Sequence, residues 1–224
     1  MGEPLPLENK KALVTGGSGD IGRAVATALA EAGADVGITY VRFQEGADKT
    51  MACIAENGRK GKAVRLDQRD TQEVERAIDE TANALGGLDI LVNNAAWNIG
   101  ITYPDIEALN PDVWDRVMET NLRGPYLLAR AAAGLLRKGD GGAIVNIAST
   151  AGISPSGSSI AYACSKAGVI HLTKCLAVAL APKAQVNCVA PGLVEGTRMA
   201  ERLPGGVANS ERAQAVLGRV GAAE

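Results

Sequence analysis

Short apolar runs alternate with longer segments of helical periodicity along most of the chain. The first run, Lys11–Thr15, ends at a cluster of glycines, and Ile21 and Val25 then begin an apolar stripe at helical spacing. The run Leu88–Val92 is apolar toward both sides, as in strands that helices cover on two faces. This alternation predicts an α/β protein.

The expected elements follow from these runs and from the residues that bound them. Strands are predicted at Lys11–Thr15, Ala34–Tyr40, Lys62–Leu66, Leu88–Val92, Ala143–Ile147 and Gln185–Val189. Helices are predicted from the glycine cluster to Gly33, up to about Asn57-Gly58, at Thr71–Leu85, from Pro111 to about Arg137 with a break at Gly124-Pro125, and at Ile160–Leu180. This order predicts a Rossmann-type, doubly wound parallel sheet with helices on both faces and a ligand site beyond the carboxyl ends of the strands. Without a repeat or a linker, residues 1–224 are expected to form a single domain.

Composition narrows the function classes. The formal charge of −2 offers no basic surface for nucleic acid. No apolar run reaches the roughly 18–20 residues of a membrane span, and the N-terminus lacks the apolar stretch of a signal peptide. The single histidine, His171, is read as structural, and the cysteines have no metal-ligand spacing: Cys53, Cys164, Cys175 and Cys188. We therefore expect a cytoplasmic protein without a metal, a membrane or a nucleic-acid partner.

A glycine-rich turn separates the first predicted strand from the first predicted helix. Gly17, Gly19 and Gly22 have the G-x-G-x-x-G spacing that lets a backbone approach a pyrophosphate at a helix N-terminus. The bare pattern is weak evidence, and the strand–turn–helix context strengthens it. The alternative is a glycine-rich turn that binds no ligand.

The same segment resembles the T-G-x-x-x-G-x-G loop of the short-chain dehydrogenase/reductase family. It reads Thr15-Gly16-Gly17-Ser18-Gly19-Asp20-Ile21-Gly22, with Asp20 in place of the middle glycine. The resemblance implies cofactor contacts from Gly16, Ser18, Asp20, Ile21 and Gly22. Aspartate tolerates a left-handed backbone better than most residues, so the turn can persist. Its charge beside a pyrophosphate is expected to weaken cofactor binding.

The end of the second predicted strand bears on the choice between NAD(H) and NADP(H). The segment Tyr40-Val41-Arg42-Phe43 contains no acid that could accept from a ribose 2′-OH, and the next acid is Glu45. This favours NADP(H) over NAD(H), with Tyr40 and Arg42 at the cofactor and Arg42 as the clamp of the 2′-phosphate. The alternative is that Arg42 is a solvated loop charge.

Two further segments resemble cofactor motifs of the family. Asp67, after the third strand, resembles the aspartate that contacts the adenine amino group. Asn93-Asn94-Ala95-Ala96 resembles the N-N-A-G turn, with alanine in place of the final glycine, and implies contacts from Asn94 and Ala95. Asparagine also favours turns without any ligand. Trp97, directly after this turn, is expected either to line the substrate pocket or to anchor the loop.

Tyr162 and Lys166 match the family's catalytic Y-x-x-x-K motif. Residues four apart lie on one face of a helix, so the Lys166 ammonium can approach the Tyr162 phenol. A cation at ~4 Å is worth about 4 kcal/mol at intermediate dielectric, which would lower the tyrosine pKa from about 10 toward neutrality. Tyr162 could then donate a proton to a carbonyl or accept one from an alcohol. The same spacing is common on plain amphipathic helices.

The remaining family positions follow in order along the chain. Ser149 stands where the family has its catalytic serine, and Asn121 matches the asparagine that holds a water near the lysine. A helix-cap or turn serine, and an asparagine kept for packing, are the alternatives. The resemblance also places Tyr162, Lys166, Pro191, Gly192 and Thr197 at the nicotinamide end of the cofactor.

The resemblance covers about residues 8 to 203 and implies an oxidoreductase of the short-chain type, nearest the β-ketoacyl-carrier-protein-reductase-like branch. Such an enzyme transfers a hydride between NADP(H) or NAD(H) and a carbonyl or alcohol substrate. The alternative is a non-catalytic dinucleotide-binding or sensor protein of the same ancestry. A homodimer or homotetramer is expected through the long helices. The sequence is also expected to lack the family's final strand, because it ends at Glu224.

Overall fold

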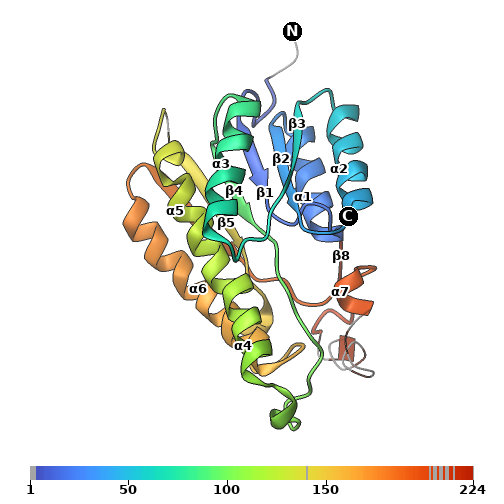
Figure 1. Cartoon of the computed structure of the whole chain (residues 1–224). Coiled ribbons are helices and arrows are strands. Elements are labelled where there is room, and N and C mark those ends of the chain that lie inside the picture. Colours follow the sequence, from blue (N-terminus) through green and yellow to red (C-terminus); the bar gives the residue numbers. More distant parts are fainter. Residues whose placement is uncertain are drawn as a thin grey trace.

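The computed structural model of the chain describes residues 4–139, 141–201, 203, 206, 209, 212–213 and 215–223. Its centre is a six-stranded sheet in the order β3-β2-β1-β4-β5-β6, and every neighbouring pair is parallel (Figure 1). The strands are β1 (Lys11–Val14), β2 (Asp35–Tyr40), β3 (Gly61–Arg65), β4 (Ile90–Asn93), β5 (Gly142–Ile147) and β6 (Ala184–Val189). The predicted Rossmann-type doubly wound sheet is therefore confirmed.

The strand order changes direction between β1 and β4. The chain moves outward from β1 to β2 and β3, and then returns to pair β4 with β1, in the register Val14 opposite Val92. Since the crossovers on the two sides of this point run in opposite directions, a crevice opens at the carboxyl ends of β1 and β4. The ligand site that the sequence predicts beyond the carboxyl ends of the strands is expected at this switch point.

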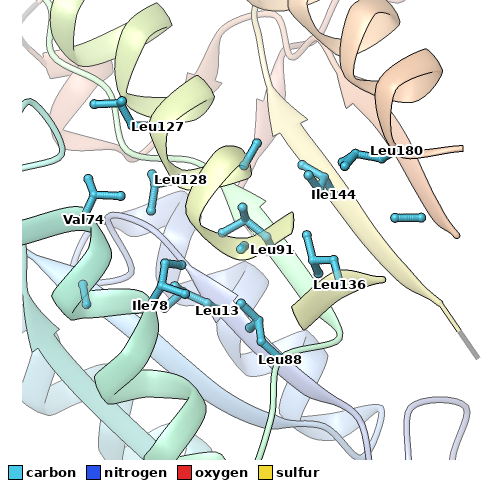
Figure 2. Packing of buried hydrophobic residues seen from close by; sticks show 14 of the residues in the cluster. Leu13, Val74, Ile78, Leu88, Leu91, Leu127, Leu128, Leu136, Ile144 and Leu180 are labelled. Carbon is cyan, nitrogen blue, oxygen red and sulfur yellow. The ribbon is translucent and has the colours of Figure 1, made fainter. Parts of the chain in front are cut away.

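Helices cover both faces of the sheet (Figure 1). They are α1 (Asp20–Glu31), α2 (Gln44–Glu56), α3 (Thr71–Leu85), α4 (Pro111–Met118), α5 (Gly124–Leu136), α6 (Ile160–Leu180) and the short α7 (Arg198–Glu201). On β1, Ala12 and Val14 pack with α1 and α2, whereas Leu13 packs with α3 and α5 on the other face. Figure 2 shows the second of these cores, in which Leu13 and Leu91 of the sheet meet Ile78 of α3. Both faces of the strands are thus buried, as the uniformly apolar runs predicted.

The predicted helix from Pro111 to Arg137 contains a π-helical turn at Glu119–Arg123, between α4 and α5. The predicted break at Gly124-Pro125 directly follows this turn. Pro125 has no amide hydrogen, so the carbonyl of Asn121 has no α-helical donor four residues on. The missing donor explains why the helix widens here.

The described residues add no seventh strand to the sheet, so β6 forms one of its edges and β3 the other. A two-residue strand, β8 (Gly221–Ala222), pairs instead with β7 (Val194–Glu195). Among the described helices only α6 is long and apolar enough to cross a membrane. This criterion rests on length and composition alone; α6 packs against β5 and β6, and 28% of its apolar stretch is buried.

Candidate active site

The glycine-rich loop requires glycine at two positions for steric reasons. Gly16 has φ +65°, and a Cβ there would lie 2.9 Å from the Cα of Ala95. A Cβ on Gly22 would lie 2.3 Å from the Gly16 carbonyl oxygen and 2.8 Å from Asn94 Nδ2. The N-cap of α1 is Gly19, which has no side chain to cap the first turn. The first amides of α1 are therefore open to an anion, which fits a pyrophosphate.

Asp20 does not occupy a left-handed position, contrary to the sequence-based expectation. It is the first residue of α1, and the left-handed residue of the loop is Gly16. The turn therefore does not depend on the tolerance of aspartate for positive φ. The carboxylate lies at the positive end of the helix dipole, which favours a negative charge.

The turn that follows β4 is bound to the glycine-rich loop. The backbone N–H groups of Asn94 and Ala95 both donate to Thr15 Oγ1, each at 3.0 Å. The Asn94 side chain donates to the Thr15 carbonyl at 2.8 Å. Asn94 thus connects the glycine-rich loop with the turn after β4, and these hydrogen bonds form without a ligand.

A cavity of about 490 Å³ lies along the carboxyl ends of β1 to β4. Its volume is within the range of roughly 300–1,000 Å³ that is typical of ligand sites. Eleven of the predicted cofactor residues line it: Gly16, Ser18, Asp20, Ile21, Gly22, Tyr40, Arg42, Asp67, Asn94, Ala95 and Thr197. A backbone cradle that admits no Cβ, an open helix N-terminus and a cleft of this size fit a dinucleotide.

A second, smaller cavity of about 130 Å³ adjoins the first. Ser149, Tyr162, Lys166, Pro191 and Gly192 line it. Several residues line both cavities: Ile21, Asn94, Ala96, Asn98, Thr197 and Met199. The two cavities are therefore contiguous, and the four remaining predicted cofactor residues line the smaller one: Tyr162, Lys166, Pro191 and Gly192.

Tyr162 and Lys166 lie almost fully buried on α6, with 8% and 3% of their surfaces exposed. Lys166 Nζ donates to the Ile147 carbonyl at 2.7 Å and lies 5.7 Å from the centre of the Tyr162 ring. Burial lowers the pKa of Lys166 to about 8, against an opposing effect of the Cys188 thiol. The two side chains of the Y-x-x-x-K motif are thus brought to one pocket, as predicted.

The expected lowering of the Tyr162 pKa is not found in the protein alone. Burial raises the pKa of the phenol, and a hydrogen bond with the Ser149 side chain only partly opposes this. The reason is that desolvation disfavours the phenolate. In the protein alone Tyr162 is therefore held as a protonated phenol, which suits a proton donor.

Ser149 caps a turn, which is one of the alternatives that the sequence left open, and it also lies in the lining of the smaller pocket. Its Oγ accepts from the N–H of Ala151 at 3.2 Å and so caps the short turn Thr150–Gly152 after β5. It also lines the pocket beside Tyr162. A capped turn holds the hydroxyl at a defined place in the pocket.

Asn121 is 1% exposed and holds protein groups with its side chain. Its Nδ2 donates to the Trp97 carbonyl at 2.9 Å and to Ser165 Oγ at 3.1 Å, and its Oδ1 accepts from the Trp97 N–H at 2.8 Å. Both amide hydrogens are thereby used. The expected water near Lys166 would have to be held chiefly by the Asn121 backbone carbonyl, which Pro125 leaves without an α-helical donor.

Trp97 lines the larger cavity and not the smaller one, so it is not a wall of the pocket beside Tyr162. Its ring packs under the guanidinium of Arg116, 4.1 Å from the ring centre. His171, which is exposed on α6, takes no part in either cavity.

The aspartate after β3 is paired with an arginine. Arg69 donates to both carboxylate oxygens of Asp67, with Nη2 to Oδ2 at 2.7 Å and Nε to Oδ1 at 3.0 Å. These hydrogen bonds hold the pKa of the Asp67 carboxyl below its ordinary value. Lone pairs of the carboxylate remain for an adenine amino group, so the expected contact is compatible with the pair.

Two residues at the site gave no signal in the sequence. Gln68 is 4% exposed and donates to the carbonyls of Ala95 at 3.1 Å and Thr120 at 2.6 Å, so it joins the β4 turn to the π-helical turn. Arg198 reaches the glycine-rich loop from α7. Neither residue stands in a motif, because each acts on segments distant in the chain.

A dinucleotide-sized cleft that continues into a pocket with a buried Tyr-Lys pair, at the switch point of a parallel sheet, is the arrangement of a nicotinamide-dependent oxidoreductase. Residues 10–206 match the model of the family described as short chain dehydrogenase, and the chain belongs to this family. The chain is 38% identical over 199 residues to the 3-oxoacyl-acyl-carrier-protein reductase of Synechocystis sp.. The aligned segment covers 88% of this chain and 78% of the relative.

Solved structures share the fold at high similarity. A short chain dehydrogenase from Burkholderia cenocepacia J2315 in complex with NADP superposes with a TM-score of 0.89 at 38% identity, over 97% of this chain and 87% of that one. An NAD+-bound xylitol dehydrogenase has the same TM-score at 27% identity, over 97% and 88% of the two chains. The protein is therefore an NAD(P)-dependent oxidoreductase that acts on a small molecule.

Proposed function

We propose that the protein interconverts a ketone and a secondary alcohol in the pocket lined by Ser149, Tyr162 and Lys166. The observation that carries the proposal is that these side chains, from β5's carboxyl end and from α6, meet in a pocket that opens into the dinucleotide cleft. The nicotinamide supplies or accepts the hydride.

Tyr162 is the proton donor to the substrate oxygen in the direction of reduction. Its raised pKa keeps it protonated until the oxygen gains negative charge. Ser149 donates a hydrogen bond to the same oxygen and orients it, because its turn holds it in the pocket. Lys166, whose pKa of about 8 lies near neutrality, returns a proton to Tyr162. Asn121 positions α6 against the β4 turn.

The test is oxidation of NADPH with a panel of ketones and ketoacyl thioesters. Turnover with at least one ketone in the wild type, and its loss in Tyr162→Phe with cofactor affinity retained, is the expected result. Full activity in Tyr162→Phe would contradict the assigned role.

The cofactor is proposed to be NADP(H) in preference to NAD(H). Tyr40 and Arg42 line the cleft where β2 ends, and the segment from 40 to 44 contains no carboxylate. An arginine there favours a 2′-phosphate. Calorimetric titration with NADPH and NADH tests this, and tighter binding of NADH would refute it.

The substrate class is proposed to include 3-oxoacyl thioesters, which the name of the Synechocystis relative supports.

Self-association as a homodimer or homotetramer is proposed through α5 and α6, on which Tyr126 and Val178 are 47% and 81% exposed. Light scattering tests the oligomeric state, and a monomer at assay concentrations would exclude it. The cytoplasmic location and the single domain stay predictions.

A further inference from the structure

The glycine-rich loop carries a negative charge where a dinucleotide would bring two more. The side chain of Asp20 is 21% exposed and lines the dinucleotide cavity. A carboxylate so close to a pyrophosphate repels it, and the repulsion is strong where water is partly excluded. A chain that binds dinucleotides at this loop needs a positive charge to compensate Asp20.

Arg198 provides this charge from the distant end of the chain. Its backbone N–H donates to Asp20 Oδ2 at 2.9 Å, and its Nε lies 3.7 Å from the same oxygen. Its Nη2 lies 3.4 Å from the Ser18 carbonyl oxygen, within the loop itself. Arg23 is the second cation, with Nη2 at 3.5 Å from Asp20 Oδ1. One carboxylate thus faces two guanidinium groups.

The position of the Arg198 guanidinium is set by an aromatic ring. The guanidinium packs over the ring of Phe43, 4.1 Å from the ring centre. Phe43 directly follows Arg42 in the chain. The Nε of Arg198 is buried and has no hydrogen-bond acceptor among the described residues. The Arg198 side chain is 42% exposed and lines the dinucleotide cavity, so the outer guanidinium nitrogens, rather than the buried Nε, are open to an anionic oxygen.

We propose that Arg198 is a cofactor-binding residue that neutralises Asp20 and binds the pyrophosphate of the dinucleotide. The proposal rests on the dinucleotide cleft described above. It assigns different tasks to two neighbouring arginines: Arg42 acts on the 2′-phosphate, which only NADP(H) has, and Arg198 acts on the pyrophosphate, which both cofactors have.

The contact of Arg198 with Asp20 and Phe43 also bears on the junction of the two cavities. Arg198 is the first residue of α7, and its neighbours Thr197 and Met199 line both the dinucleotide cleft and the pocket beside Tyr162. When Arg198 is held by Asp20 and Phe43, the start of α7 is held at the junction of the cavities. Loss of the contact should therefore also raise the KM for the ketone.

The experiment is a calorimetric titration of the full chain with NADPH and with NADH. Arg198→Met keeps an unbranched side chain next to Phe43 and removes the guanidinium charge, and Arg42→Met is its matched control. We expect Arg198→Met to weaken both cofactors about tenfold. Arg42→Met should weaken NADPH alone. Arg198→Lys should remain within about threefold of the wild type, since it retains the charge.

A double-mutant cycle with Asp20→Asn separates compensation from packing. Asparagine keeps the shape of Asp20 and removes the repulsion, so the loss of affinity caused by Arg198→Met should fall from about tenfold to about threefold in that background, and the part that remains is the direct contact with the pyrophosphate. An equal loss with and without Asp20, or a loss limited to NADPH, would overturn the proposal. If Arg198→Met does not fold, the comparison of Arg198→Lys with the wild type decides, and a loss of tenfold or more there refutes the role of charge. Failure of the wild type to bind either cofactor would refute the dinucleotide cleft instead.

Discussion

Asn121 and Trp97 exchange two hydrogen bonds between a side chain and a backbone, with the Trp97 N–H donating to Oδ1 and Nδ2 donating to the Trp97 carbonyl. The second Nδ2 hydrogen reaches Ser165 on α6. One buried amide therefore joins the loop after β4, the π-helical turn and the helix that carries Tyr162. Such turns occur frequently at functional sites, and here the turn is tied to the proposed catalytic helix.

Replacement of Asn121 by alanine should destabilise the protein by about 3 kcal/mol, because the partly buried N–H and carbonyl of Trp97 and the buried Ser165 hydroxyl would each lose a partner. The measurement is urea unfolding. Asn57→Ala is the control, since Asn57 is exposed and makes a single hydrogen bond to the Cys53 carbonyl. A similarly small effect of both variants would contradict the structural role of Asn121.

Removal of the Tyr162 hydroxyl should reduce kcat by about 10²–10⁴-fold, the usual contribution of general acid catalysis, with NADPH affinity within about threefold of wild type. Phenylalanine preserves the ring that packs in the pocket. Tyr126→Phe, on the exposed side of α5, should leave kcat unchanged. Stopped-flow measurement of NADPH oxidation distinguishes slow chemistry from slow product release.

Lys166 should make the stability of the protein depend on pH above neutrality. Burial lowers the pKa of Lys166 from its ordinary value of 10.5 to about 8 in the folded chain. Between these values the unfolded chain holds more protons, so the free energy of unfolding rises with pH. Below about pH 8 both states are protonated, and the cost of burying the charge is present in full.

The measurement is the difference in the free energy of unfolding between wild type and Lys166→Met at pH 7 and pH 9.5. Between pH 7 and pH 9.5 the free energy of unfolding of the wild type should rise by about 2 kcal/mol relative to that of the variant. The difference cancels the titration of groups common to both chains. A gap that stays constant would show that folding leaves the pKa of Lys166 unchanged, and a gap that moves in the opposite direction would show that folding raises it; either result contradicts the prediction.

A methyl group on Gly22 should disrupt the loop. The added Cβ would lie 2.3 Å from the Gly16 carbonyl oxygen, so the backbone must shift. We expect a loss of about 1–3 kcal/mol in stability, as for overpacked sites, together with the loss of measurable NADPH binding. Thermal unfolding and calorimetry measure the two effects.

Gly134→Ala is the matched control on α5. Nothing lies within 4 Å of a Cβ at Gly134, and the residue is within a helix. Alanine should stabilise the protein by about 0.5–1 kcal/mol and leave cofactor binding unchanged. A stabilising effect at Gly22 as well would mean that the loop does not approach α1 as closely as described.

Local patterns were sufficient for much of this protein. The bounds of α3 and α6 agree with the sequence prediction, because Asp70 and Ser159 cap the helices just before periodic segments. Strand ends shifted by one or two residues: β4 covers Ile90–Asn93 and not Leu88–Val92, since pairing with β1 and β5, rather than hydrophobicity, determines where a strand ends.

The sequence by itself determined the alternation of strands and helices, the glycines of the loop and the common helix face of Tyr162 and Lys166, because periodicity, steric freedom and i, i+4 spacing are local properties. Ser149 and Asn121 were indicated by the family resemblance and not by a local pattern. Only the tertiary structure decided that Arg198 meets Asp20 across 178 residues, and that burial moves the pKa values of Tyr162 and Lys166. The physical reason is the same in each case. Charge pairing and desolvation depend on which segments the crossovers of the sheet bring together, and no local pattern records this.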